Sequence, residues 1–177
     1  SKLVKDDAIL LTDAGANLTF FMQAFQTKKN QRVISAWGNS PMGYSVAAGI
    51  GAKIAKKNAQ VISLIGDGSF LINLQELQFI KFNKIALKIV IYDNKVFGNT
   101  KIGCRDYKIN SIGNDKQGGY HSPEVPKIAK AFNIKYFYLK NNINKKKIIN
   151  NFLKFKGSSI LHLNINKNHE LIEHSVK

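Results

Sequence analysis

The sequence is poor in several features, and each shortage narrows what the protein can be. It has one cysteine, Cys104, which excludes an internal disulfide and a metal site built from cysteines and is typical of the reducing cytoplasm. No apolar run reaches the roughly 18 residues of a membrane-spanning helix. The first residues include Lys2, Lys5, Asp6 and Asp7, which interrupt any apolar stretch. We therefore expect a cytoplasmic protein with no membrane segment and no signal peptide.

Acidic residues are also scarce. Asp and Glu number 11 against 27 Lys and Arg, so the formal net charge is +16. Such an excess favours nucleic-acid binding when it is gathered on one element. Here the lysines are scattered, in runs no longer than Lys145–Lys147, and the aromatic residues lie mainly inside apolar runs. Because an exposed stacking platform is missing, we expect no nucleic-acid partner.

The 177 residues suffice for one domain with a sizeable core, and we expect residues 1–177 to form a single domain. Apolar runs typical of buried strands alternate with segments of helical apolar spacing. Strands are predicted at 8–12, 32–35, 61–65, 87–92, 135–139 and 159–164, and helices at 18–25, 43–56, 70–82, 123–132 and 143–155. This alternation predicts an α/β fold, a three-layer parallel sheet with helices on both faces.

Residues 93–122 interrupt the alternation. The stretch contains several glycines and little apolar periodicity, so it is predicted to be a long loop. Loops of this length are uncommon inside compact domains and are usually functional. We therefore expect a functional loop, with a surface insertion as the alternative. His121, at the end of this stretch, could line a site there.

Polar residues follow two of the predicted strands. Asp67 comes after the strand at 61–65, and the pair Asp93-Asn94 comes after the strand at 87–92. In an open parallel sheet, ligands bind outside the carboxyl ends of the strands. The side chains of Asp67 and Asn94 could share a Mg²⁺ ion, which usually takes one or two protein side chains together with phosphate and water.

The residues around Asp67 suit an anion. Gly68 would let the backbone approach a phosphate closely. Ser69 is predicted to cap a helix that begins near Phe70, so that the positive end of the helix faces the anion. Together with Asn94, this pattern predicts a metal-bridged diphosphate site, whereas Gly66–Gly68 alone could be an ordinary turn between a strand and a helix.

These motifs occur in the order and spacing of a known family. The run Gly66-Asp67-Gly68 followed by Asp93-Asn94 resembles the signature of thiamine-diphosphate enzymes. Residues 35–52 and 12–17 are similar to segments of acetolactate synthases, and the resemblance extends from about residue 8 to residue 164. It implies the domain that binds the diphosphate end of thiamine diphosphate, together with Mg²⁺. It also implies that residues 93–122 are a mobile active-site loop that closes over the cofactor and the substrate.

The resemblance also assigns roles to single residues. The metal ligands would be the side chains of Asp67 and Asn94 and the carbonyl of Val96. The carbonyl of Ser40 and the N–H of Met42 would meet the aminopyrimidine ring, and the Met42 side chain would support the bent cofactor. The full set of implied cofactor-binding residues is Asn17, Ser40, Met42, Gly66, Gly68, Ser69 and Gly98.

Thiamine diphosphate serves as an electron sink that lets carbon dioxide leave a 2-oxo acid. The resemblance therefore implies an enzyme that decarboxylates a small 2-oxo acid such as pyruvate and joins the two-carbon unit to a carbonyl acceptor. It implies a homo-oligomer, a dimer or a tetramer. Two alternatives stay open: the small subunit of a two-chain 2-oxo-acid decarboxylase, and a non-catalytic phosphate-binding domain.

Two features depart from the family. Asp93 stands where acetolactate synthases commonly have Asn, and it could either support the neighbouring metal ligand or cap the strand. The activating glutamate of the family lies on a separate pyrimidine-binding domain, and no glutamate here matches it. The chain contains only Glu76, Glu124, Glu170 and Glu173. We therefore expect no catalytic residue in this chain and a pyrimidine-binding domain, from the same or another chain, as its partner.

Overall fold

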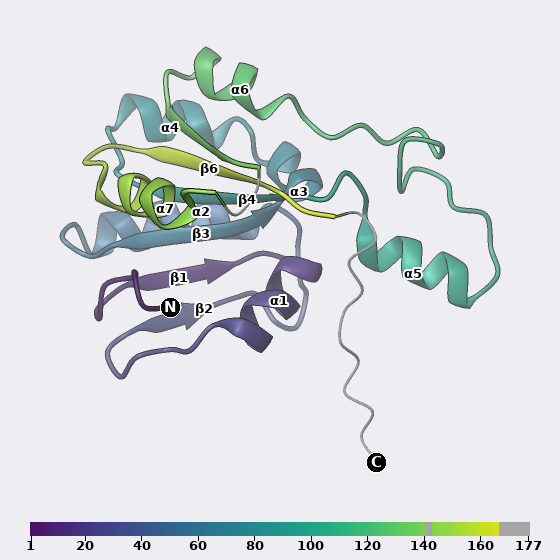
Figure 1. The fold of residues 1–177 in the computed structure, drawn as a ribbon, viewed down its shortest axis with the longest axis horizontal. Helices are drawn as coiled ribbons and strands as arrows, with labels where there is room; N and C mark the ends of the chain where they lie inside the picture. Colours follow the sequence, from purple (N-terminus) through teal and green to yellow (C-terminus); the bar gives the residue numbers. More distant parts are fainter. Residues whose placement is uncertain (141–142, 167–177) are drawn as a thin grey trace.

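The computed structural model of the protein describes residues 1–140 and 143–166. Its six strands form one sheet, in the order β2-β1-β3-β4-β6-β5, and all neighbouring strands are parallel (Figure 1). The elements are β1 (Ile9–Thr12), α1 (Ala16–Ala24), β2 (Arg32–Ile34), α2 (Tyr44–Ala55), β3 (Val61–Gly66), α3 (Asp67–Ile72), α4 (Glu76–Phe82), β4 (Lys88–Asp93), α5 (Gly98–Asp106), α6 (Val125–Ala131), β5 (Lys135–Leu139), α7 (Lys145–Lys154) and β6 (Ser159–Asn164). The predicted α/β fold is confirmed.

Helices cover both faces of the sheet, which gives two hydrophobic clusters. Ile65 and Ile89 point to the face covered by α2, α4 and α6. Leu64 and Val90, their neighbours in sequence, point to the face covered by α1 and α7. Successive residues of a strand face opposite sides, so a strand buried on both sides is mainly apolar rather than alternating. That requirement explains the mainly apolar runs that predict the central strands.

The helix predicted at 70–82 is two helices. The first, α3, begins at Asp67 with Gly66 as its N-cap residue, and the second, α4, begins at Glu76. The predicted capping role of Ser69 is therefore wrong, because this residue lies inside the first turn of α3. The break falls at Asn73, whose side-chain amide donates to the carbonyl of Gly43 at 3.0 Å.

The prediction of an irregular loop over 93–122 is also wrong in part. Residues Gly98–Asp106 form α5, which extends beyond the sheet (Figure 1). Only Cys104 is buried in this helix, so it has no apolar stripe that sequence periodicity could reveal. It is held by tertiary contacts instead: the amide of Asn114 donates to the Cys104 sulfur at 3.3 Å, and Lys101 pairs with Asp115 at 2.9 Å.

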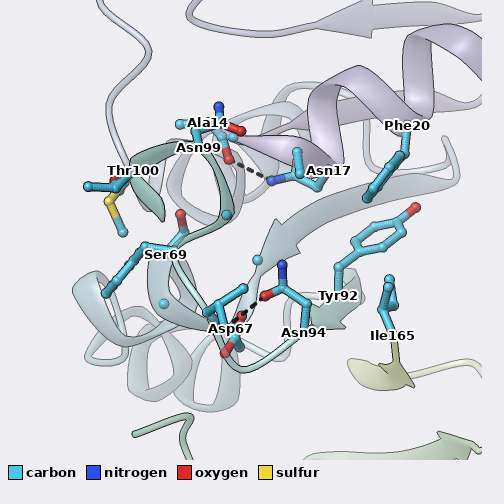
Figure 2. Close-up of a pocket in the computed structure, with 18 of the residues that line it drawn as sticks. Ala14, Asn17, Phe20, Asp67, Ser69, Tyr92, Asn94, Asn99, Thr100 and Ile165 are labelled. Atoms are coloured by element: carbon cyan, nitrogen blue, oxygen red, sulfur yellow. Dashed lines mark hydrogen bonds between the residues drawn. The ribbon is translucent and has the colours of Figure 1, made fainter. Parts of the chain in front are cut away.

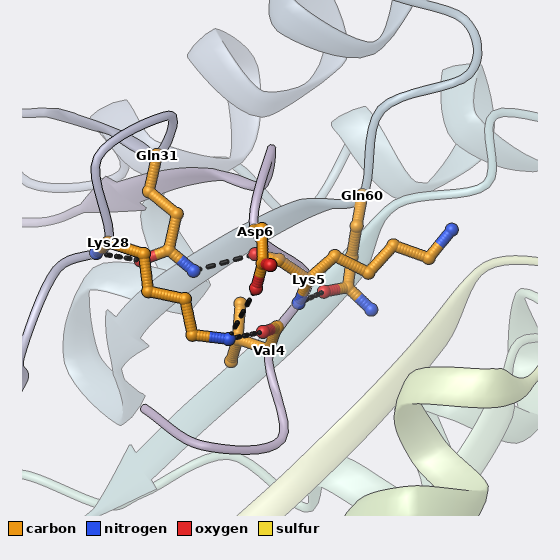
Figure 3. Close-up of polar contacts among 6 residues, drawn as sticks. All are labelled: Val4, Lys5, Asp6, Lys28, Gln31 and Gln60. Atoms are coloured by element: carbon orange, nitrogen blue, oxygen red, sulfur yellow. Dashed lines mark hydrogen bonds and ion pairs between the residues drawn. The ribbon is translucent and has the colours of Figure 1, made fainter.

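Polar contacts fasten the start of the chain to the amino ends of the strands (Figure 3). The Lys28 ammonium pairs with Asp6 at 2.7 Å, and the Gln31 side chain donates to the carbonyl of Lys5 at 2.6 Å. The N–H of Lys5 donates to the side chain of Gln60, just before β3, at 2.9 Å. The opposite edge of the sheet, where the strands end, is left for a site.

Among residues 1–140 and 143–166, every helix is too short or too polar to span a membrane.

Candidate functional site

A cavity of about 310 Å³ lies at the carboxyl ends of β3 and β4 (Figure 2). It is lined by every residue for which the sequence predicts a role in binding the metal or the cofactor. Those residues are Asn17, Ser40, Met42, Gly66, Asp67, Gly68, Ser69, Asn94, Val96 and Gly98. Segments far apart in sequence supply them, and the parallel sheet brings these segments together at one edge. Sequence reasoning missed other lining residues, among them Phe20, Tyr92, Phe97, Thr100 and Ile165.

The oxygen atoms suited to a metal come from adjacent strand ends. β3 and β4 are neighbours, with Gly66 opposite Tyr92, so Asp67 and Asn94 both follow the sheet at the same edge. The Asn94 side-chain oxygen accepts the N–H of Val96 at 3.2 Å, which fixes its orientation. No group of three or more His, Cys, Asp and Glu able to hold a metal occurs among the described residues. This donor set fits Mg²⁺, which completes its shell with phosphate and water.

Asp67 is 2% exposed, and its carboxylate is strongly affected by that burial. Burial raises its pKa to about 6, and the charge of Asp93 adds to the rise, while hydrogen bonds from the Tyr120 and Ser122 hydroxyls oppose it. The Tyr120 hydroxyl donates to Asp67 Oδ2 at 2.7 Å. Burial, followed by the charge of Asp67, raises the pKa of Tyr120, so this hydroxyl remains a donor.

Asp93 belongs to a polar network behind the cavity and does not line it. The Ser122 hydroxyl donates to its Oδ1 at 2.8 Å, and the His162 ring meets its Oδ2 at 2.9 Å. The other nitrogen of His162 meets the Tyr136 hydroxyl at 2.9 Å. Burial alone would raise the pKa of Asp93, but the hydrogen bonds from His162 and Ser122 lower it overall. His121 is exposed and does not line the cavity.

Gly68 is needed for a close contact that its sequence motif does not reveal. A Cβ atom at this position would lie 2.3 Å from the Phe97 ring. That ring in turn packs against Tyr120, with their centroids 4.4 Å apart. The absence of a side chain at Gly68 therefore lets the segment after β4 fold down onto α3.

A buried carboxylate positions the turn that carries Ser40 and Met42. Asp13, at the end of β1 and 1% exposed, accepts the N–H groups of Gly43 at 3.0 Å and Ser45 at 2.8 Å. These amides begin α2, where a negative charge is favourable. The bond from Asn73 to the Gly43 carbonyl secures the turn from the other side. Asp13 and Asn73 thus connect β1 and the α3–α4 break to one wall of the cavity.

Asn17 offers the cavity an unused acceptor. Its side-chain amide donates to the carbonyl of Ala14 at 2.6 Å, but its Oδ1 atom is buried and has no partner among the described residues (Figure 2). A buried polar atom without a partner is costly unless a ligand satisfies it. The half-exposed apolar side chain of Met42 lines the same cavity. These features fit a ligand that combines hydrogen-bond donors, apolar surface and a metal-bound anion.

Asp67 is the one acidic residue of the cavity lining. Glu76 begins α4, and Glu124 pairs with Lys127 at the surface, so neither reaches the cavity. Glu170 and Glu173 lie outside the described residues. The described part of the chain therefore supplies one carboxylate to the cavity lining and no glutamate.

Comparison with known proteins agrees with this geometry. Residues 13–163 match the C-terminal TPP binding domain of thiamine pyrophosphate enzymes, TPP being another name for thiamine diphosphate. The chain is 35% identical, over 73% of its length, to a probable acetolactate synthase large subunit of Methanocaldococcus jannaschii. It is 32% identical, over 92% of its length, to the acetolactate synthase large subunit of Porphyra purpurea.

The chain is much shorter than these relatives. It covers 22% of the Methanocaldococcus protein and 27% of the Porphyra protein, about a quarter of their length. A chloroplastic acetolactate synthase of Zea mays is 32% identical over 75% of the chain, which covers 22% of that relative. The protein therefore belongs to the thiamine pyrophosphate enzymes, as a C-terminal cofactor-binding domain of the acetolactate synthase-like kind.

Proposed function

We propose that residues 1–177 form one domain that holds Mg²⁺ and the diphosphate of thiamine diphosphate in an acetolactate synthase-like enzyme. The enzyme would decarboxylate a 2-oxo acid such as pyruvate and join the two-carbon unit to a carbonyl acceptor. Thiamine diphosphate supplies the electron sink for this chemistry. Asp67, Asn94 and the Val96 carbonyl would hold the metal, and Gly68 and Ser69 would donate backbone N–H groups to the diphosphate.

One observation carries this proposal: the oxygen donors of Asp67, Asn94 and Val96 share a cavity with the unpartnered Asn17 acceptor and the apolar Met42. The first N–H groups of a helix have no partner within it, so Gly68 and Ser69 at the start of α3 have donors to offer. The similarity to acetolactate synthase large subunits favours a larger synthase over a two-chain decarboxylase.

The remaining half of the active site would come from a pyrimidine-binding domain of the same or another chain. No glutamate of the described residues lines the cavity, and the family relatives are several times longer than this chain. Large apolar side chains are exposed on α3 and α4, including Ile72, Phe79 and Phe82. Exposed apolar side chains are typical of an interface where they form one contiguous patch. We propose a cytoplasmic homodimer or tetramer with each cofactor between two domains.

Titration calorimetry with thiamine diphosphate, with and without Mg²⁺, tests the metal site. Asp67→Ala should abolish Mg²⁺-dependent binding, because Mg²⁺ then loses its carboxylate ligand and the charge of the diphosphate is no longer neutralised. Asn94→Ala should weaken binding by at least the roughly 10–100-fold that follows loss of an outer partner of a metal ligand. Asp106→Ala, at the exposed end of α5, serves as the matched control and should bind normally. Unchanged affinity in a folded Asp67→Ala variant would disprove the proposal.

A further inference from the structure

The segment after α5 reaches back to the metal-binding edge of the sheet. In this docked segment, residues 107–122, two hydroxyl groups donate to carboxylates at strand ends. Tyr120 donates to Asp67 after β3 at 2.7 Å, and Ser122 donates to Asp93 at the end of β4 at 2.8 Å. The docked segment therefore contacts both strands that supply the candidate metal ligands.

Tyr120 is one of the buried residues of the docked segment. It is 9% exposed, as is Asp115, and Asn114 is 4% exposed, whereas Tyr107 and Ile112 of the same segment are 81% and 79% exposed. Its ring packs on Phe97, which lies against Gly68, and its N–H donates to the carbonyl of Asp115 at 2.8 Å. Both the ring and the hydroxyl of Tyr120 are thus fixed in place, and the hydroxyl meets a buried carboxylate.

We propose that Tyr120 is a positioning residue that couples docking of residues 107–122 to loading of the metal at Asp67. The inference rests on the proposed function, which makes Asp67 a metal ligand. A hydrogen bond to one oxygen of a ligating carboxylate holds its plane and thereby orients the other oxygen. Coupling of this kind is reciprocal: the contribution of Tyr120 to metal affinity equals the contribution of the metal to docking of the segment.

The opposite role for Tyr120 makes an opposite prediction. If its hydroxyl merely occupied the place of the metal, the two would compete for Asp67. Removing the hydroxyl would then strengthen Mg²⁺ binding, and metal binding would release the docked segment. The sign of the change in affinity therefore distinguishes positioning from competition.

The test uses the full-length natural protein and the variant Tyr120→Phe, which keeps the ring packed on Phe97. Calorimetry measures the Kd of Mg²⁺ at saturating thiamine diphosphate. Trypsin cleavage after Lys108 and Lys116, followed by mass spectrometry, measures docking with and without both ligands. Tyr107→Phe, an exposed tyrosine of the same segment, is the matched control.

We expect Tyr120→Phe to raise the Kd of Mg²⁺ roughly 10–100-fold. The ligands should protect both trypsin sites in the wild type and in Tyr107→Phe, and much less in Tyr120→Phe. Ser122→Ala provides a second measurement of docking that leaves Tyr120 intact, and it should reduce protection because the Ser122 hydroxyl donates to Asp93 at the end of β4.

Two results would overturn the inference. One is an unchanged or lower Kd of Mg²⁺ in Tyr120→Phe. The other is ligand protection of the trypsin sites in Tyr120→Phe and Ser122→Ala that equals the protection in the wild type. Either result, obtained with a wild type that binds Mg²⁺ and thiamine diphosphate, rejects the role of Tyr120 and leaves the proposed function standing. A wild type that binds neither ligand rejects the proposed function itself.

Discussion

Lys88 is a lysine in the interior of the sheet, at the start of β4 and 5% exposed. Its ammonium donates to the carbonyls of Phe155 and of Gly157, the latter at 2.7 Å, and lies 5.4 Å from the centre of the Phe155 ring. Burial, followed by the charge of Lys53, lowers its pKa to about 8. The hydrogen bonds of Lys88 join β4 to the turn between α7 and β6. Burial deprives its charged ammonium of hydration, which costs free energy.

This lowered pKa predicts an unusual dependence of stability on pH. Between pH 8 and the ordinary lysine pKa, the unfolded chain holds a proton at Lys88 that the folded chain has released, so stability rises with pH. We expect the free energy of unfolding in urea to rise by about 2 kcal/mol from pH 8 to pH 9.5. The rise should be absent in Lys88→Met and present in Lys81→Met, which changes an exposed lysine of α4. An equal rise in both variants would contradict the assignment.

At the scale of elements, α2 approaches the sheet closely because it carries glycine where it meets β3. A Cβ atom at Gly49 would lie 2.4 Å from Ser63 Oγ and 3.0 Å from the Leu87 side chain. The Ser63 hydroxyl donates to the Ser45 carbonyl at 2.7 Å, in the first turn of α2. The distance between α2 and the sheet thus depends on residue 49 being a glycine.

Two alanine substitutions in α2 separate close packing from helix propensity. Gly49→Ala should destabilise the fold by about 1–3 kcal/mol, because the added methyl must displace Ser63 or Leu87. Gly51→Ala, with nothing within 4 Å of the added atom, should stabilise it by about 0.5–1 kcal/mol through helix propensity. Urea unfolding of both variants measures the two effects, and changes of the same sign would refute the argument.

The segment from about Asn99 to Gly119 carries the other prediction at this scale. We expect it to be mobile without cofactor and partner domain, because little of its surface is apolar and buried. Tyr107, Ile109 and Ile112 are all exposed there, so little apolar burial opposes the entropy of ordering. Hydrogen exchange of the cofactor-free chain should show fast amides in this segment and slow ones in β3 and β4. Slow exchange throughout the segment would show that it is ordered by itself.

At the scale of the whole molecule, the cavity lies at one edge of the sheet, and Asp67 is the acidic residue that lines it within residues 1–140 and 143–166. A domain that holds only the diphosphate end of the cofactor would leave the aminopyrimidine end partly in water. Electrostatic preorganisation then falls short, because water replaces fixed dipoles around the reacting atoms. We infer that catalysis needs a second domain that closes over this edge.

The isolated 177-residue chain is accordingly expected to be inactive. It should bind thiamine diphosphate and Mg²⁺ yet release no carbon dioxide or acetolactate from pyruvate, because it offers no glutamate to activate the cofactor. The assay is carbon dioxide release at micromolar protein, repeated after addition of a pyrimidine-binding domain. Sustained turnover by the chain alone would show that the active site is complete within it.

Local patterns in the sequence suffice to predict the sheet and most of the candidate site. β3 and β4 are mainly apolar because they are buried on both faces, and the polar residues Asp67 and Asn94 follow directly after them. Since parallel strands end at the same edge of the sheet, the motifs that follow them lie close together there. The sequence pattern of the strands is therefore enough to predict this placement. The order of the motifs then suffices to indicate the family.

The remaining features depend on contacts between residues that no local pattern relates. The hydroxyl of Tyr120 meets Asp67 across 53 positions, His162 meets Asp93 across 69, and Asn73 meets Gly43 across 30. α5 forms without an apolar stripe because distant side chains hold it. A strand or an amphipathic helix is determined by its own periodicity. Long-range hydrogen bonds and close glycine contacts exist only when the folded chain brings their partners together, so only the tertiary structure decided them.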